Sequence, residues 1–145
     1  MEGAAEQNLI SSASGMAHEG LIPYVNTIAS FLTRRCYEQI YINLGMHKNR
    51  VRLIANGGGV VYGPLGPTHL ALDDISLLKN IPNMTILVPA DEIEVTKMMR
   101  ATINHKGPIY FRIAKGGDPI VTNGLYKKFK IGKPYKIGRE YKSII

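Results

Sequence analysis

The stretch Val51–His69, VRLIANGGGVVYGPLGPTH, decides the fold class of this chain. Its first five residues are mostly apolar and predict a short buried strand. The strand leads directly into a loop with five glycines and two prolines, which ends at Thr68 and His69. A plain turn explains one or two glycines, whereas open α/β sheets bind ligands in loops that follow the carboxyl ends of their strands. The stretch therefore predicts an α/β sheet with a ligand site in this loop.

The loop matches neither of two common phosphate-binding motifs. Gly57 and Gly59 begin a G-x-G, but Tyr62 stands where G-x-G-x-x-G requires its third glycine. The motif G-x-x-x-x-G-K-[ST] does not occur in the sequence. We therefore exclude both a dinucleotide and a nucleoside triphosphate as the ligand that these motifs would bind.

Helical and strand-like segments alternate on both sides of the loop. The spacing of the apolar residues predicts helices over 4–19, 31–47, 73–79 and 91–104, and strands over 21–28, 51–55, 84–88 and 109–113. This alternation is typical of an α/β fold with a mostly parallel sheet flanked by helices. A helix opens the sequence and no helix closes it. We therefore expect a sheet that is incomplete at both ends, within a larger subunit or one completed by a partner.

The composition indicates one ordinary domain followed by a basic tail. The chain has 145 residues, of which 45% are hydrophobic, and a formal net charge of +7. Residues 124–145 hold seven of the 18 basic side chains and one of the 11 acidic ones, which leaves residues 1–123 with a net charge of +1. We expect a folded domain over 1–123 and a basic linker or tail over 124–145.

The tail has two interpretations. Its basic residues are Lys127, Lys128, Lys130, Lys133, Lys136, Arg139 and Lys142, and its aromatic residues are Tyr126, Phe129, Tyr135 and Tyr141. Cations interleaved with aromatic rings are typical of grooves for single-stranded nucleic acid. A solvated or partner-docking extension is the alternative that we favour, so we do not expect nucleic acid to be the ligand.

The single cysteine, the absence of long apolar runs and the N-terminal sequence indicate the cellular compartment. Cys36 forms no internal disulfide, and it has no neighbours at metal-ligand spacing. No apolar run approaches the roughly 20 residues that span a bilayer, and the N-terminus lacks the pattern of a signal peptide. We expect a cytoplasmic protein that does not enter a membrane and that holds no metal ion through its own residues.

Six short segments resemble, in order, the pyrimidine-binding domain of the transketolase family. These segments are Gly3–Asn8 (GAAEQN), Phe31–Arg34 (FLTR), Gly66–His69 (GPTH), Ile81–Thr85 (IPNMT), Pro89–Asp91 (PAD) and Pro108–Arg112 (PIYFR). The resemblance covers about residues 3–117. The family includes transketolases, deoxyxylulose-phosphate synthases and dehydrogenase subunits, and the resemblance implies the thiamine-diphosphate-binding fold of that domain.

The resemblance implies a cofactor and two catalytic residues. Glu6 matches the glutamate whose carboxylate hydrogen-bonds to the pyrimidine ring of thiamine diphosphate and promotes proton loss from the cofactor. His69 matches a histidine that faces the thiazolium ring and the substrate. Phe31 matches the aromatic residue that packs on the pyrimidine, and Tyr24 and Thr27 are further candidates for this pocket. The alternative, purely structural interpretations are a first-turn glutamate for Glu6, a structural histidine for His69 and a core phenylalanine for Phe31.

Three positions depart from transketolases that use phosphorylated ketoses. Leu65 stands where those enzymes have an aspartate that contacts the donor hydroxyl, and Gly57 stands where they have a histidine. Lys115 aligns with an arginine that binds the substrate phosphate. Leucine accepts no hydrogen bond, and lysine offers a point charge in place of a bidentate fork. We expect these positions, with His69, to define an altered substrate site.

The resemblance also implies a partner. The family holds the cofactor's diphosphate through a divalent metal, Mg²⁺ or similar, with a G-D-G motif and a downstream Asn on a separate domain, and neither occurs here. The tail resembles the family's linker to a C-terminal domain. We expect a transketolase-like transferase that moves a two-carbon ketol unit between small sugars, with a diphosphate-binding partner subunit, as a homodimer or a dimer of heterodimers. The alternative is a truncated or degenerate, non-catalytic interaction module.

Overall fold

The computed structural model describes residues 3–125 and 127–133. The chain consists of two compact units. Residues 1–88 and 105–117 belong to the first unit, and residues 89–104 and 118–145 belong to the second. The tail residues Tyr126, Tyr135, Lys136, Arg139, Glu140, Tyr141 and Lys142 lie outside the described residues. A domain boundary at residue 123 stays a prediction.

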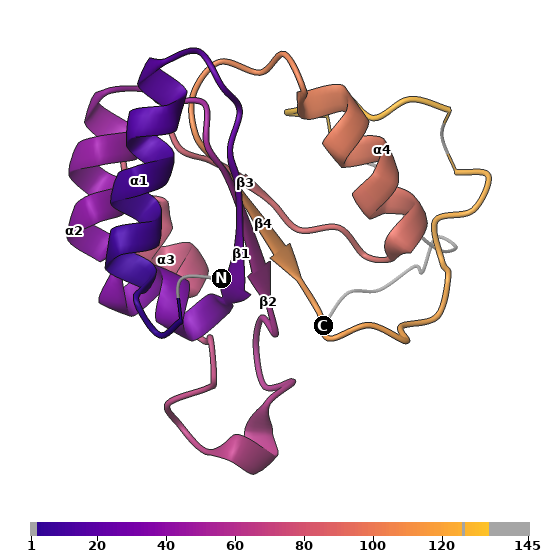
Figure 1. The fold of residues 1–145 in the computed structure, drawn as a ribbon. Coiled ribbons are helices and arrows are strands. Elements are labelled where there is room, and N and C mark those ends of the chain that lie inside the picture. The colour runs from indigo at the N-terminus through magenta and orange to yellow at the C-terminus, as the bar shows by residue number, and fades with distance from the viewer. Residues whose placement is uncertain (1–2, 126, 134–145) are drawn as a thin grey trace. The chain divides into compact units, whose positions relative to one another are not determined.

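The first unit is built on a four-stranded parallel sheet, as the alternating pattern predicts (Figure 1). The strand order is β1-β2-β4-β3, and the strands are β1 (Tyr24–Ile28), β2 (Arg52–Asn56), β3 (Thr85–Leu87) and β4 (Ile109–Ile113). In this register Val25 lies opposite Leu53, which lies opposite Tyr110. All three residues are buried and belong to the hydrophobic core.

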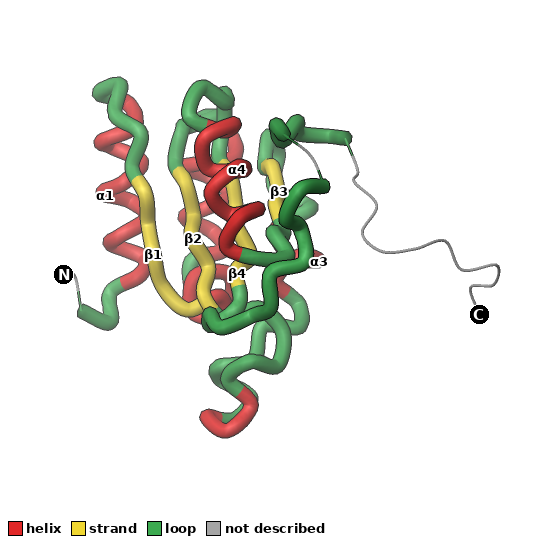
Figure 2. Tube along the Cα trace, turned by 90° about the vertical axis from the view of Figure 1, so that its right-hand side faces the viewer, coloured by secondary structure: helices red, strands yellow, loops and turns green. Residues whose placement is uncertain are grey.

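Helices of the first unit cover one face of the sheet (Figures 1 and 2). Helix α1 (Glu6–His18) places Ile10 and Ala13 in the core, and Gly20, with a φ of +88°, ends the helical segment as expected. The short helix α3 (Asp74–Leu78) places Leu78 in the same core. The four strands and the helices α1 and α3 of this unit were predicted from the sequence to within a few residues.

The predicted helix over 31–47 winds more loosely than an α-helix. It consists of π-helix η1 (Phe31–Arg35), a short α-helix α2 (Tyr37–Gln39) and π-helix η2 (Ile40–Met46). Its apolar residues repeat every fourth position, whereas an α-helix completes a turn in about 3.6 residues, so this row would drift around an α-helix. Wider π turns correct the drift, and Leu32, Cys36, Ile40 and Leu44 are all fully buried.

A long loop connects β2 to α3 and projects away from the sheet (Figure 2). It contains the short 3₁₀-helix η3 (Gly63–Leu65). An antiparallel bridge between Gly59 and Ala71 closes its base, because each backbone N–H donates to the other's carbonyl at 2.9–3.0 Å. The glycine-rich segment is therefore a loop whose two ends are held together by the bridge between Gly59 and Ala71.

The second unit contains helix α4 (Glu92–Thr102) and the segment after Asp118. Asp91 caps the helix by accepting the Glu94 N–H, and it also accepts the N–H groups of Val121 and Thr122 and the Thr122 hydroxyl. Burial alone would raise the pKa of Asp91, but these hydrogen bonds hold it well below its usual range. In the part of the chain that the structure describes, no helix is long and apolar enough to cross a membrane.

Candidate active site at the carboxyl end of β1

Glu6 is a buried carboxylate at the start of α1. The residue is 7% exposed, and its Oε2 accepts a hydrogen bond from Arg35 Nη1 at 2.6 Å. Its neighbours Ala4 and Ala5 are exposed. Glu6 is both a first-turn glutamate, favoured by the helix dipole, and one half of an ion pair.

The charge state of Glu6 follows from two opposing effects. Burial alone would raise its pKa, because a carboxylate loses hydration. The hydrogen bond from its own backbone N–H and the hydrogen bond and positive charge of Arg35 lower the pKa by more. The net result is a pKa below the usual value, so Glu6 is an ionised acceptor at neutral pH.

Phe31 and Arg35 lie one turn apart on η1 and contact each other. The guanidinium carbon of Arg35 lies 4.9 Å from the centroid of the Phe31 ring, which is a cation–π distance. The His69 ring meets the same phenyl ring edge-on, with centroids 4.9 Å apart. Phe31 is half-buried and so is not a core phenylalanine, whereas its neighbours Leu32 and Thr33 are fully buried.

Phe31 and Arg35 line a cavity of about 420 Å³ together with Ser30, Arg34 and Thr68. We refer to this cavity as the hollow. It lies just after the carboxyl end of β1, where open α/β sheets place their ligands. The Ser30 hydroxyl donates to the Thr68 carbonyl at 2.9 Å, which attaches the loop to the strand end. The structure thus brings residues from α1, η1 and the loop to one place.

His69 is oriented by its neighbour in the loop. Its Nδ1 shares a hydrogen bond with the Thr68 hydroxyl at 3.0 Å. Among the described residues, His69 Nε2 has no hydrogen-bond partner. The imidazole therefore keeps one nitrogen for an exogenous donor or acceptor.

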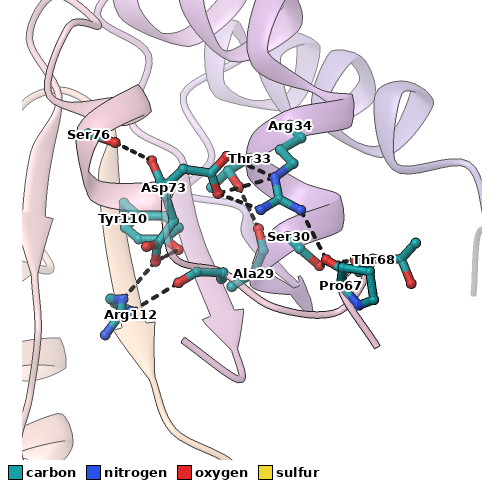
Figure 3. Close-up of polar contacts among 12 residues, drawn as sticks. Ala29, Ser30, Thr33, Arg34, Pro67, Thr68, Asp73, Ser76, Tyr110 and Arg112 are labelled. Atoms are coloured by element: carbon teal, nitrogen blue, oxygen red, sulfur yellow. Dashed lines mark hydrogen bonds and ion pairs between the residues drawn. The ribbon is translucent and has the colours of Figure 1, made fainter. Parts of the chain in front are cut away.

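Arg34 holds the loop beside the hollow (Figure 3). Its Nε and Nη2 donate to the two carboxylate oxygens of Asp73 at 2.9 and 2.8 Å, which is a bidentate pair. The hydrogen bond from Arg34 is the main cause that lowers the pKa of Asp73, with burial opposing it. Arg34 Nη1 also donates to the Pro67 carbonyl at 3.5 Å. One arginine thus connects η1 to both the loop and the start of α3.

A buried cluster below the loop was not predicted from the sequence. Asp74 is fully buried, and its Oδ2 accepts hydrogen bonds from the Tyr110 hydroxyl at 2.8 Å and from Arg112 Nε at 2.7 Å. Arg112 Nη2 donates to the Ala71 carbonyl at 3.1 Å. Burial and the charge of Asp74 raise the pKa of Tyr110, so its hydroxyl stays a donor. The sequence feature that could have indicated this cluster is the presence of the charged residues Asp74 and Arg112 in otherwise apolar segments.

The structure places Gly57 and Leu65 in the loop. Gly57 has a φ of +75°, and a Cβ there would overlap the Tyr62 ring, so only glycine fits while Tyr62 holds its position. Leu65 lies in η3 and is 57% exposed. Neither residue lines the hollow.

The remaining predicted site residues lie elsewhere. Tyr24 begins β1, at the opposite end of the strand from the hollow, and is 46% exposed. Thr27 is half-buried near the carboxyl end of β1 but does not line the hollow. Lys115 follows β4 and is exposed. Glu6, Phe31 and His69 are therefore the predicted residues that the fold brings together, in contact either directly or through Arg35.

The parallel sheet, with a hollow just after the carboxyl end of β1, has the arrangement that ligand-binding α/β domains share. The sequence profile described as "Transketolase, pyrimidine binding domain" matches residues 3–117. The chain belongs to this family, as its six sequence segments indicate. The match and the parallel sheet confirm the predicted family and fold class, and thiamine diphosphate is the cofactor that this family binds.

Curated relatives are transketolase-type proteins. The chain is 38% identical over 131 residues to a putative uncharacterized transketolase family protein of Sinorhizobium fredii, covering 90% of this chain and 38% of that one. It is 34% identical over 131 residues to one subunit of the apulose-4-phosphate transketolase of Phocaeicola vulgatus, covering 90% and 42%. It is 38% identical over 134 residues to a 1-deoxy-D-xylulose-5-phosphate synthase of Parasynechococcus marenigrum, covering 90% and 20%. The chain thus spans about two fifths or less of the length of these relatives.

Two solved structures share the fold. The chain superposes on a split-gene transketolase described as an inactive β4 tetramer with a TM-score of 0.78 and 31% identity, covering 89% of this chain and 41% of that one. It superposes on the transketolase of Campylobacter jejuni with a TM-score of 0.71 and 21% identity, covering 77% and 17%, which supports the fold alone.

Proposed function

We propose that this chain is the pyrimidine-binding part of a thiamine-diphosphate-dependent transferase that moves a two-carbon ketol unit between small sugars. The observation that carries the proposal is the contact series from the Glu6 carboxylate through Arg35 to the Phe31 ring and His69 at the hollow. These are the residue types that the chemistry needs, and they come from three separate segments.

The residues present fit the pyrimidine half of the cofactor. A buried, ionised carboxylate is a strong acceptor for an N–H donor of a heteroaromatic ring. A half-buried phenyl ring beside it offers a face on which such a ring can pack. When bound, thiamine diphosphate supplies the nucleophilic carbon that takes up and passes on the ketol unit.

Each residue then has a defined task. Glu6 accepts a hydrogen bond from the pyrimidine ring and so fixes its protonation pattern. Phe31 orients the ring by packing against it. His69, fixed at Nδ1 by Thr68, offers Nε2 to a substrate hydroxyl and accepts or returns its proton. The catalytic roles of Glu6 and His69 are part of this proposal.

We further infer that a partner subunit carries the diphosphate and its divalent metal ion. Support comes from the relatives, because one is named as a single subunit of a transketolase and one solved structure is a split-gene transketolase. The complete enzyme would be a dimer of heterodimers, or a homodimer if the second domain belongs to the same polypeptide.

Reconstitution tests the proposed function. The chain is mixed with a polypeptide that carries G-D-G and its downstream Asn, with Mg²⁺, thiamine diphosphate, a ketose donor and an aldose acceptor. We expect ketol transfer by the mixture and not by either component alone. A complex that binds the cofactor but fails to turn over any donor would favour the non-catalytic module, which the departures at Leu65 and Gly57 also allow.

A further inference from the structure

Arg35 makes two contacts that are also expected of the cofactor. Its Nη1 donates to Glu6 at 2.6 Å, and its guanidinium lies over the Phe31 ring at 4.9 Å. Glu6 and Phe31 are the two residues proposed to bind the pyrimidine ring. In this structure, the guanidinium therefore uses both partners at once.

The chemistry of the two groups is similar. A guanidinium is planar and cationic, and it presents N–H donors at its edge and a flat face to an aromatic ring. An aminopyrimidine that donates to a carboxylate is likewise a planar group with N–H donors and a stacking face. A carboxylate beside a phenyl ring can therefore bind either group, but Glu6 Oε2 and the same face of Phe31 cannot serve both fully.

We propose that Arg35 is an internal stand-in for the pyrimidine ring: its guanidinium occupies Glu6 and Phe31 in the cofactor-free chain and is displaced when thiamine diphosphate binds. This inference rests on the proposed function. It makes Arg35 a positioning residue, because it acts on the site through Glu6 and Phe31.

The environment of Arg35 suits a side chain that moves on a fixed backbone. Its side chain is 45% exposed, whereas that of Glu6 is 8% exposed. Its carbonyl accepts a hydrogen bond from Gln7 Nε2 at 3.1 Å, and its backbone belongs to η1, whose buried residues anchor it in the core. The neighbouring Arg34 differs, because Asp73 holds it by a bidentate pair. Rotation of one long side chain would clear the site without any change of fold.

The stand-in has a function in the free chain. Without a cation beside it, a buried carboxylate tends to take up a proton, because burial raises its pKa. Arg35 keeps Glu6 ionised, and the nearby Cys36 thiol stays neutral, since burial and the charge of Glu6 raise its pKa to about 11. Glu6 is thereby held as an acceptor until the cofactor arrives.

The test uses the full chain and its complex with the diphosphate-binding partner. Arg35→Met removes the charge and the N–H donors but keeps a long side chain, and Arg35→Lys keeps the charge without the planar fork. Arg100→Met, at an exposed position of α4, is the matched control. The probe is thiamine diphosphate with Mg²⁺ at about pH 8, well above the ordinary pKa of a glutamate carboxyl.

Calorimetric titration of the complex gives the first readout. We expect Arg35→Met to bind thiamine diphosphate about three- to tenfold more tightly than wild type, because a half-exposed ion pair and a cation–π contact each contribute modestly. Arg35→Lys should fall between the two, and Arg100→Met should match wild type. Binding by Arg35→Met that is equal to or weaker than wild type would overturn the proposal.

Nuclear magnetic resonance gives a readout that does not depend on activity. In the free chain, the Glu6 carboxyl should titrate at a higher pH in Arg35→Met than in wild type. In the wild-type complex, the Arg35 Nε–H signal should shift when the cofactor is added, and an unchanged signal would contradict displacement. If the wild-type complex binds no cofactor, both the proposed function and the displacement of Arg35 are refuted. If the complex binds the cofactor but substitution of Arg35 does not change the affinity, only the displacement is refuted.

Discussion

The two segments that meet at the hollow are held in different ways. The segment from α1 to η1 fixes its functional side chains directly, because Glu6 and Phe31 stand on helices whose other faces are buried in the core. The loop between β2 and α3 is fixed through its backbone, since the carbonyls of Pro67, Thr68 and Ala71 accept the anchoring hydrogen bonds. The positions of Glu6 and Phe31 therefore depend on the core packing of their own helices, whereas the path of the loop depends on hydrogen bonds to its backbone.

The strongest test of the loop's attachment is removal of its buried anchor. Asp74→Ala should destabilise the chain by about 3 kcal/mol, because it leaves the charge of Arg112 and the Tyr110 hydroxyl without their shared acceptor. The measurement is urea unfolding followed by circular dichroism.

The adjacent Asp73 supplies the control. Its ion pair with Arg34 is exposed at both ends, so Asp73→Ala should cost no more than about 1 kcal/mol. Equal losses for the two alanine variants would show that the buried cluster is not the principal anchor.

At the cofactor end, Glu6→Gln tests side-chain identity. In the reconstituted complex the variant should lose roughly 100-fold or more in rate, because general acid–base assistance typically supplies about 10² to 10⁴. The fold should survive, since glutamine keeps the shape of the side chain. Steady-state kinetics and proton exchange at the cofactor's thiazolium carbon are the measurements.

Glu38→Gln, at an exposed position of α2, is the matched control and should retain the wild-type rate. A near-normal rate for Glu6→Gln, with normal proton exchange, would refute the role assigned to Glu6.

The altered loop predicts a change of donor. Without the aspartate and histidine that Leu65 and Gly57 replace, an ordinary phosphoketose lacks two hydrogen bonds worth about 0.5 to 1.5 kcal/mol each. Its kcat/KM should therefore lie roughly 10- to 100-fold below that of the preferred sugar, such as an unphosphorylated or deoxygenated ketose. Xylulose 5-phosphate as the best donor would mean that other residues replace the missing contacts.

The smallest expected effect concerns the basic tail. Truncation after Asn123 removes seven basic residues and one acidic residue but none of the proposed site residues. Both forms should show only weak attraction to single-stranded DNA or RNA. A sub-micromolar affinity that falls steeply with salt and disappears on truncation would establish the nucleic-acid interpretation instead.

Much of the fold could be predicted from the sequence because its signals are local. Short, mostly apolar segments identify β2 and β4, and Gly20 marks a helix end through its positive φ. The π turns of η1 and η2 were not predicted, because a four-residue repeat shows that one face is buried but not how the backbone achieves it. The resemblance, and not the periodicity, indicated Glu6 and His69.

The contacts that organise the site depend on packing between distant segments. Glu6 and Arg35 are 29 positions apart, and they meet because α1 and η1 lie on the same face of the sheet. Asp74 and Arg112 are 38 positions apart, and their hydrogen bond connects the first residue of α3 to β4. No local sequence pattern indicates such pairs, so the ion pair between Glu6 and Arg35 was not predicted.

The central claim is that this chain supplies the pyrimidine half of a shared cofactor site. Titration calorimetry with thiamine diphosphate and Mg²⁺ tests it most directly, first on the chain alone and then on its complex with a diphosphate-binding partner. We expect weak or undetectable binding by the chain alone and tight, stoichiometric binding by the complex. Tight, stoichiometric binding by the isolated chain would contradict the account.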